Sequence, residues 1–159
     1  MRVLHHLPPN VQALLQRHID EHAAYPREVL GALTQAIRDE LGNGDPELAR
    51  EMAAFLAEYD LHRELAQYFK TGDPAFTLSR MDAIIHHHWG EVPVQVENAA
   101  NRHLRMRVTR TGNLTPEACR YNLPGWMEGA IRAAGGHPRV RKVKCVDNGD
   151  PWCEYEVGW

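Results

Sequence analysis

The spacing of apolar residues changes once along this chain, at Gly90. Before Gly90, apolar side chains recur every three to four residues, as in Val29, Leu33 and Ile37, which is the period of an amphipathic helix. After it, they alternate with polar residues, as at 92, 94 and 96, which is the period of a strand. A chain that switches period in this way is expected to form an α+β fold, with N-terminal helices packed on a sheet.

Four helices are predicted in the helical part, residues 1–90. Two of them begin at the pairs Asp45-Pro46 and Asp73-Pro74, which combine a capping Asp with a Pro suited to the first turn. Gly42 and Gly90 are residues at which a helix typically ends. The predicted helices cover residues 11–19, 26–41, 45–69 with a bend near Asp60, and 74–90.

The second part, residues 91–159, predicts a β-β-α-β-β unit. The first hairpin has strands near 92–96 and 104–108, joined by a turn at 98–101. A helix at 115–134 follows, and a second hairpin pairs 140–145 with 153–159. A slip in the alternation at Val140, Val143 and Cys145 indicates a β-bulge. The result is a four-stranded antiparallel sheet within a single domain, 1–159.

Composition restricts the classes of partner. The net charge of -3 gives no basic surface for nucleic acid, and no apolar run is long enough to span a membrane. The first ten residues lack the apolar core of a signal peptide. A cytoplasmic protein that binds neither nucleic acid nor membrane is expected.

The three cysteines follow the pattern C-x25-C-x7-C. A hairpin turn would bring Cys145 close to Cys153, and Cys119 could approach the same end of the sheet. Three converging thiolates can bind zinc with a fourth ligand from Asp, Glu, His or water. Two alternatives stay open: the cysteines are small core residues, or Cys145 and Cys153 form a disulfide on oxidation.

His86-His87-His88 is the second candidate site, because neutral imidazole is the commonest metal ligand. Successive helical residues point about 100° apart, so the three cannot all face one ion. The alternative is a favourable interaction of the imidazoles with the end of the helix dipole.

Aromatic and Met side chains predict a pocket for a small hydrophobic ligand between helices and sheet. Its predicted lining is Tyr59, Phe69, Phe76, Met81, Trp89, Met106, Tyr121 and Trp126. Tyr68 and Met127 belong to the same set of side chains expected to point inward. The alternative is that these residues are ordinary core. No dinucleotide, phosphate-loop, nucleophile-elbow or zinc-protease motif is present, so a binding module is favoured over an enzyme.

The segments Gly125-Trp126-Met127-Glu128-Gly129 and Cys153-Glu154-Tyr155-Glu156-Val157-Gly158-Trp159 resemble the 4-vinyl-reductase-like domain family over residues 90–159. That family shares a superfamily with haem nitric-oxide-binding (H-NOX) domains and with subunits of the TRAPP vesicle-tethering complex. The resemblance implies a zinc ion held by Cys119, Cys145 and Cys153. The family's fourth ligand, a Glu, is replaced by Lys142, which cannot donate a lone pair. Another ligand would be needed, from Asp147, Asp150, Glu154 or His137.

The resemblance further implies a sensor that binds a small molecule and acts on a separate signalling protein, with a homodimer as one form. The alternative is a haem-based gas sensor or a small enzyme of tetrapyrrole metabolism. Haem bound in the H-NOX manner would require an axial His near Met81 and a Tyr-x-Ser-x-Arg motif after the second strand, and the sequence has neither.

Overall fold

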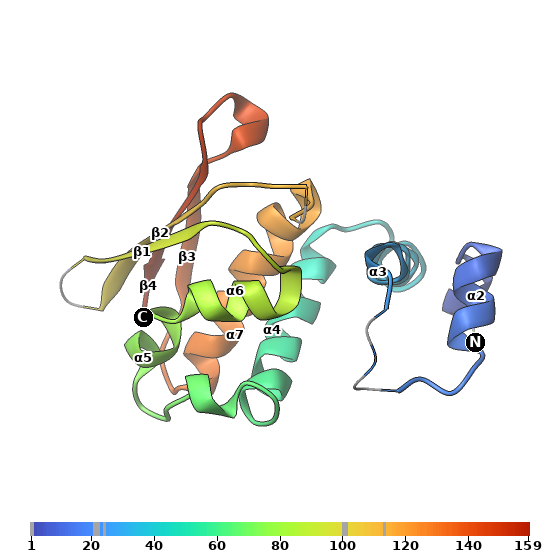
Figure 1. Ribbon diagram of the computed structural model, residues 1–159, viewed down its shortest axis with the longest axis horizontal. Helices are drawn as coiled ribbons and strands as arrows, with labels where there is room; N and C mark the ends of the chain where they lie inside the picture. The colour runs from blue at the N-terminus through green and yellow to red at the C-terminus, as the bar shows by residue number, and fades with distance from the viewer. Residues whose placement is uncertain (1, 21–22, 24, 100–101, 113) are drawn as a thin grey trace. The chain divides into compact units, whose positions relative to one another are not determined.

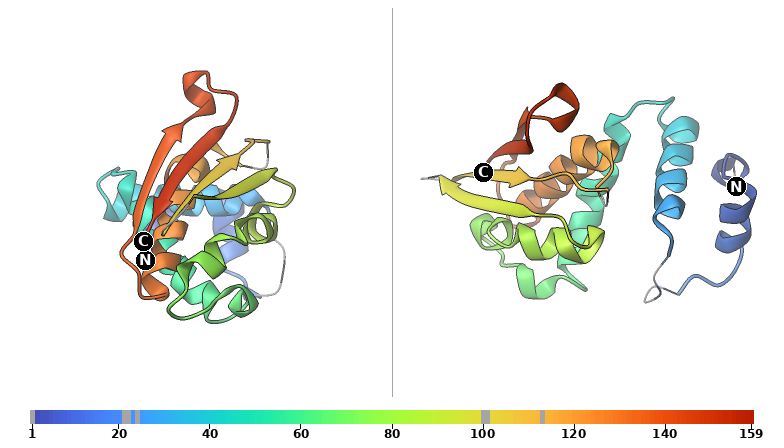
Figure 2. Two further views of the ribbon diagram at one scale, coloured as in Figure 1. Left: turned by 90° about the vertical axis from the view of Figure 1, so that its left-hand side faces the viewer. Right: turned by 45° about the horizontal axis from the view of Figure 1, so that its top comes forward.

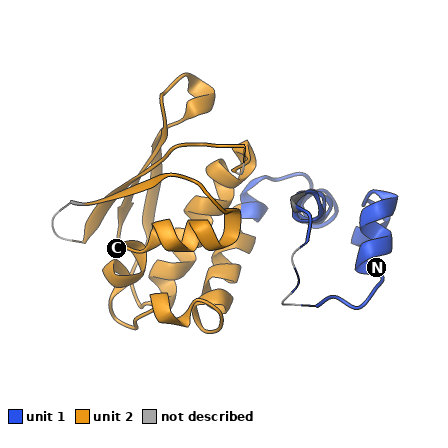
Figure 3. Ribbon diagram, in the orientation of Figure 1, with its two compact units in different colours: residues 1–49 blue, residues 50–159 orange. Residues whose placement is uncertain are grey.

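The structure, a computed structural model, describes residues 2–20, 23, 25–99, 102–112 and 114–159. The chain forms two compact units, residues 1–49 and residues 50–159 (Figure 3).

Unit 1 contains the helices α1 (Arg2–His5), α2 (Pro9–Leu15) and α3 (Arg27–Leu41). Its core is formed by Leu7, Val11 and Ala36. Pro9 occupies the first turn of α2, and Gly42 follows α3, as predicted. Helix α1 was not predicted. Helix α2 ends four residues before the predicted end, and Ile19 is 51% exposed because it lies outside any helix.

The helices of unit 2 are shorter than predicted. Helix α4 (Glu47–Leu61) does not continue to residue 69, and a single 3-10 turn, η1 (Ala66–Tyr68), follows it. The predicted helix 74–90 is two helices, α5 (Pro74–Leu78) and α6 (Met81–Trp89). The break has a local cause: the Ser79 hydroxyl and the Arg80 guanidinium both donate to the Phe76 carbonyl oxygen, and Arg80 also stacks on the Phe76 ring. Such side-chain bonds compete with the helical pattern.

The sheet confirms the predicted topology. Its strands are β1 (Val94–Ala99), β2 (His103–Val108), β3 (Arg139–Lys144) and β4 (Cys153–Gly158), all antiparallel in the order β1-β2-β4-β3. Of the predicted turn 98–101, residues 100 and 101 lie outside the described residues, and 98 and 99 belong to β1. The predicted bulge is present, because the register of β3 shifts between Lys142 and Lys144.

One face of the sheet forms the core of unit 2, and helices α6 and α7 (Leu123–Ala133) lie on that face (Figures 1 and 2). Leu104, Met106, Tyr155 and Val157 point inward and have no exposed surface. Charged residues alternate with them on the opposite face, where Glu154 is covered by neighbouring side chains and the others reach the solvent. The α+β prediction is therefore confirmed.

Two glycines explain how α7 packs against α4. A side chain on Gly125 would come within 2.1 Å of the Arg50 carbonyl oxygen, and one on Gly129 within 2.1 Å of the Ala54 carbonyl oxygen. The two backbones approach closely because these positions have no Cβ. Among the described residues, no helix is long and apolar enough to cross a membrane.

Candidate functional site

An open groove of about 780 Å³ runs along α6 where the chain passes from this helix into the sheet. Its lining comes from η1, α6, the loop before β1 and the loop after β2. The lining residues are Tyr68, Asp82, Ala83, His86, His87, Glu91, Val92, Pro93 and Thr111. This volume is that of a small-molecule site, although the groove is open to solvent and does not enclose a ligand.

The local sequence gives the groove its shape. Helix α6 ends at Gly90, whose φ of 71° turns the chain back toward the sheet. The N–H of Thr109 donates to the Pro93 carbonyl oxygen at 3.0 Å, which extends the pairing of the first hairpin by one bond. Thr111 then lies against Glu91, with its hydroxyl 3.5 Å from the Glu91 carbonyl oxygen. The loop wall of the groove is thus attached to the sheet.

The three histidines of α6 face different partners. His86 and His87 line the groove, and His87 Nε2 lies 3.6 Å from a Glu64 carboxylate oxygen. His88 instead lies 3.5 Å from Asp60 and packs against Trp89 and Trp126. Burial, together with the charge of the neighbouring His87, lowers the pKa of His88 to about 4 against the opposing effect of the Glu64 carboxylate, so its ring is neutral at neutral pH. The expectation that one ion cannot collect all three imidazoles agrees with this arrangement.

The predicted cysteine site forms a cluster of sulfur atoms around Lys142. Cys119 and Cys153 are fully buried and share a side-chain hydrogen bond, and Lys142 Nζ donates to Cys119 Sγ at 3.3 Å. The Tyr155 hydroxyl lies 2.9 Å from the same sulfur and donates to the Cys119 carbonyl oxygen. Burial raises the pKa of Cys119 to about 11 and raises that of Tyr155. Both groups are neutral at physiological pH.

Cys145 occupies the more open side of this cluster. It borders a small pocket of about 230 Å³ together with Arg120, Lys142 and Lys144. Its burial opposes ionisation, but hydrogen bonds from Lys142 and from the Asp147 backbone hold the pKa of the Cys145 thiol below its usual value. Cys145 is therefore the thiol best suited to react with a small molecule.

The zinc prediction is not supported. All three cysteines carry free thiols, and within the described parts of the chain no three His, Cys, Asp or Glu side chains are placed to hold a metal ion. Lys142 places an ammonium group beside the sulfur atoms, where a metal cation would be repelled.

The eight predicted pocket residues are dispersed. Met81, Met106 and Trp126 lie in the core, while Phe69 and Trp89 pack against it. Tyr59 is 47% exposed, and the Phe76 ring lies under Arg80. The remaining residue, Tyr121, is half-buried in the π-helical turn η2 (Ala118–Asn122). None of the eight lines the groove along α6.

Sequence reasoning did not identify the groove. His86 and His87 carried a signal as part of the histidine run, and Tyr68 was among the aromatic side chains expected to point inward. Ala83, Val92 and Pro93 carry no signal in the sequence. They line one groove only because the chain turns back at Gly90, after α6 ends.

The packing does not fit haem between α6 and the sheet. Met81, Ile84 and Ile85 face the sheet with no accessible surface, and Leu104 and Met106 opposite them have none either. No water-sized space therefore adjoins these five side chains. His88 continues the inward face of α6, but it contacts Asp60 and Trp126 instead of facing the sheet. A porphyrin could bind between α6 and the sheet only if α6 moved away from the sheet.

No protein-family profile matches the sequence, and no curated protein is similar to it. Solved structures do match. An H-NOX domain from Shewanella oneidensis, in an Fe(II)CO state, superposes with a TM-score of 0.71 at 15% identity, covering 92% of this chain and 85% of that one. The fold is H-NOX-like.

Two further structures agree. An unliganded Fe(II) H-NOX protein from K. algicida has a TM-score of 0.69 at 10% identity, over 98% of this chain and 83% of its own. A trafficking protein particle complex subunit 3 from Naegleria fowleri, covalently bound to palmitic acid, has a TM-score of 0.58 at 14% identity, over 80% and 88%. An H-NOX domain and a trafficking protein particle complex subunit are thus both similar to this chain in fold. None of these matches shows the 4-vinyl-reductase-like family itself.

Proposed function

We propose that this chain is a small-molecule sensor domain that binds its ligand in the groove along α6 and acts on a separate signalling protein. The observation that carries this proposal is the position of the groove across the link between α6 and β1. The H-NOX proteins of the same fold support a sensor role, because their structures are described in different ligation states.

The lining indicates the chemistry of the ligand. Tyr68, Val92 and Pro93 offer apolar surface, while His86 and His87 offer ring nitrogens that can donate or accept hydrogen bonds. The carboxylates of Asp82 and Glu91 also border the groove, which favours an uncharged or cationic ligand over an anion. A small, largely apolar molecule with one or two polar groups suits such a surface. Neither haem nor zinc forms part of this proposal.

The same helix connects the groove to the core. Ala83, His86 and His87 form its groove side, whereas Met81, Ile84 and Ile85 form its sheet side. A ligand that pulls α6 toward Pro93 changes how the helix packs on the sheet. Because packed cores switch between discrete arrangements, a small shift of α6 can be transmitted to a partner protein.

Binding can be tested with the uncharged fluorescent probe N-phenyl-1-naphthylamine, which combines apolar rings with one N–H donor. We expect the probe to bind the intact protein saturably and one to one. We also expect the rate of amide hydrogen exchange in α6 to change when the probe is bound. Ala83→Trp would fill the groove and abolish saturable binding. Ala133→Trp places the same ring on another half-buried helical position outside the groove and serves as the matched control.

Two results would contradict the proposal. One is probe binding that survives Ala83→Trp unchanged. The other is exchange rates in α6 that do not respond to a bound probe, which would leave a binding site with no sensing role.

A further inference from the structure

The solvent face of the sheet carries rows of charged residues that run across the strands. In one row, Arg105 of β2, Glu156 of β4 and Arg141 of β3 are direct neighbours. The Glu156 carboxylate lies between the two guanidinium groups, 2.5 Å from Arg141 and 3.7 Å from Arg105. Their positive charge lowers the pKa of Glu156.

The next row repeats this arrangement. Glu154 of β4 lies between Arg107 of β2 at 2.8 Å and Lys144 of β3 at 3.8 Å. Its pKa is lowered, mainly by the bond from Arg107. In both rows a carboxylate of the central strand occupies the space between two bases.

The third row has the bases but not the acid. Its members are His103 of β2, Gly158 of β4 and Arg139 of β3. Within the described residues, no carboxylate forms an ion pair with Arg139 or with the adjacent Arg102. Glycine at the central position leaves a space where the other two rows have a glutamate.

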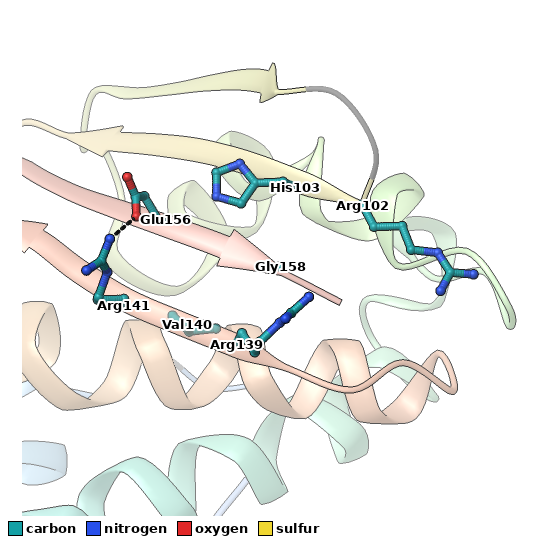
Figure 4. A pocket seen from close by; sticks show the side chains of 7 residues that line it. All are labelled: Arg102, His103, Arg139, Val140, Arg141, Glu156 and Gly158. Carbon is teal, nitrogen blue, oxygen red and sulfur yellow. Dashed lines mark hydrogen bonds and ion pairs between the residues drawn. The ribbon is translucent and has the colours of Figure 1, made fainter.

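This space is part of a pocket of about 360 Å³ on the face of the sheet (Figure 4). His103 and Arg139 lie on either side of Gly158, and Arg102 extends past the end of β4. The one acid that lines the pocket, Glu156, is already paired with Arg141. The guanidinium groups of Arg139 and Arg102 therefore carry positive charge that no carboxylate of the described residues neutralises in an ion pair.

We propose that this pocket binds a carboxylate group supplied from outside the chain, at the position that Glu154 and Glu156 occupy in their own rows. Arginine suits this role because its guanidinium can donate two parallel hydrogen bonds to one carboxylate. The site lies on the solvent face of the sheet, opposite the face covered by α6, so it is independent of the ligand groove.

The test is an NMR titration of the full chain with sodium acetate, with sodium chloride at equal ionic strength as the reference. We expect saturable shifts of the amide signals of His103 and Gly158. Arg139→Gln should weaken binding about tenfold, the usual effect of losing a charged hydrogen bond. Gly158→Glu should abolish binding, because it supplies the missing carboxylate from the chain itself.

Gly158→Glu is compatible with the fold. A Cβ at this position would meet its nearest atoms at 3.7 Å or more, which is ordinary contact. Lys144→Gln removes one positive charge from the same face outside the pocket and should change acetate affinity less than twofold, since its partner Glu154 keeps the ion pair with Arg107. A short peptide with a single Glu, blocked at both ends, distinguishes a protein source of the carboxylate from a small molecule by binding more tightly than acetate.

Linear, unsaturable shifts would overturn the proposal. Equal loss of affinity in Arg139→Gln and Lys144→Gln would also overturn it, since that result means general attraction to a basic surface.

Discussion

The backbone carbonyl oxygen of Ala54 lies within 2.1 Å of the point where a Gly129 side chain would begin. Real Cβ atoms do not approach an oxygen this closely. The segment Gly125-Trp126-Met127-Glu128-Gly129 therefore has a packing role: its two glycines let α7 rest directly on the backbone of α4. The Arg50–Glu128 ion pair at 2.6 Å joins the same two helices.

Gly129→Ala should destabilise the protein by about 2 kcal/mol or more, because the added methyl group forces the two helices apart. Urea unfolding monitored by circular dichroism measures this. Gly31→Ala is the matched control, since Gly31 is also helical but a Cβ there meets nothing within 4 Å. The control should be slightly stabilised, by roughly 0.5–1 kcal/mol. Equal stability of Gly129→Ala and the native protein would show that α4 and α7 do not pack as described.

Cys145 should be the first thiol to react with iodoacetamide in the folded protein. Its pKa is lowered by Lys142, whereas burial raises that of Cys119. Lys142→Met should slow the reaction at pH 7 by several-fold, because only the thiolate reacts. Mass spectrometry of peptides from briefly treated protein identifies the modified residue. Modification of Cys119 before Cys145 would contradict the placement of both residues.

Folding stability should fall between pH 6.5 and pH 4 because of His88. The folded-state pKa of about 4 lies below the ordinary 6.5, so in this window the unfolded chain binds a proton that the folded chain does not. The contribution of the neutral ring is complete above pH 6.5 and is lost as the pH falls. The difference between the unfolded-state and folded-state pKa values corresponds to a loss of ~3 kcal/mol of folding free energy at most.

Solvent reduces this effect, since the His88 side chain is 26% exposed. About 1–2 kcal/mol is expected. Burial raises the pKa of Asp60, so at low pH the folded chain binds this proton more readily than the unfolded chain. Asp60 therefore partly offsets the loss of folding stability caused by His88. Comparing urea unfolding of the native protein with His88→Gln at pH 7.5 and pH 5 isolates the imidazole. An identical pH dependence in the two proteins would rule out His88 as the cause.

The purified protein should not bind haem in a defined complex. Met81, Ile84 and Ile85 fill the space between α6 and the sheet, so added haemin should give no sharp Soret band at one equivalent. His88→Ala should behave like the native protein. A stoichiometric Soret band that the His88 substitution removes would show that this core opens and that His88 is an axial ligand.

The sequence was sufficient to predict features that depend on neighbouring residues. The alternation around Val94 and Met106 predicted the first hairpin, and Asp73 caps α5 by accepting a bond from the Phe76 N–H, as its Asp-Pro signal indicated. The irregular spacing in β3 predicted the bulge. The break in the helix at Ser79 was not predicted, because side-chain hydrogen bonds to the backbone leave no mark on the spacing of apolar residues.

Features that depend on pairing between distant segments could not be predicted. The charged rows exist only in the register that sets Arg139 opposite Gly158 and Gly158 opposite His103. Likewise, C-x25-C-x7-C predicted that the sulfur atoms approach one another, and the family resemblance put Lys142 at the position of the fourth ligand. Neither could show that the Lys142 ammonium group would donate a hydrogen bond to the sulfur of Cys119.

The bulge in β3 has a consequence for how copies of this protein meet. Strand β3 lies at the edge of the sheet, where unpaired N–H and C=O groups could recruit a strand from another chain. Arg139, Arg141 and Lys144 point outward from it, and Lys142 points inward opposite Tyr155. A second copy of this strand would be repelled by like charges and would meet an irregular backbone. The edge is thus protected against the stacking of strands that leads to fibrils.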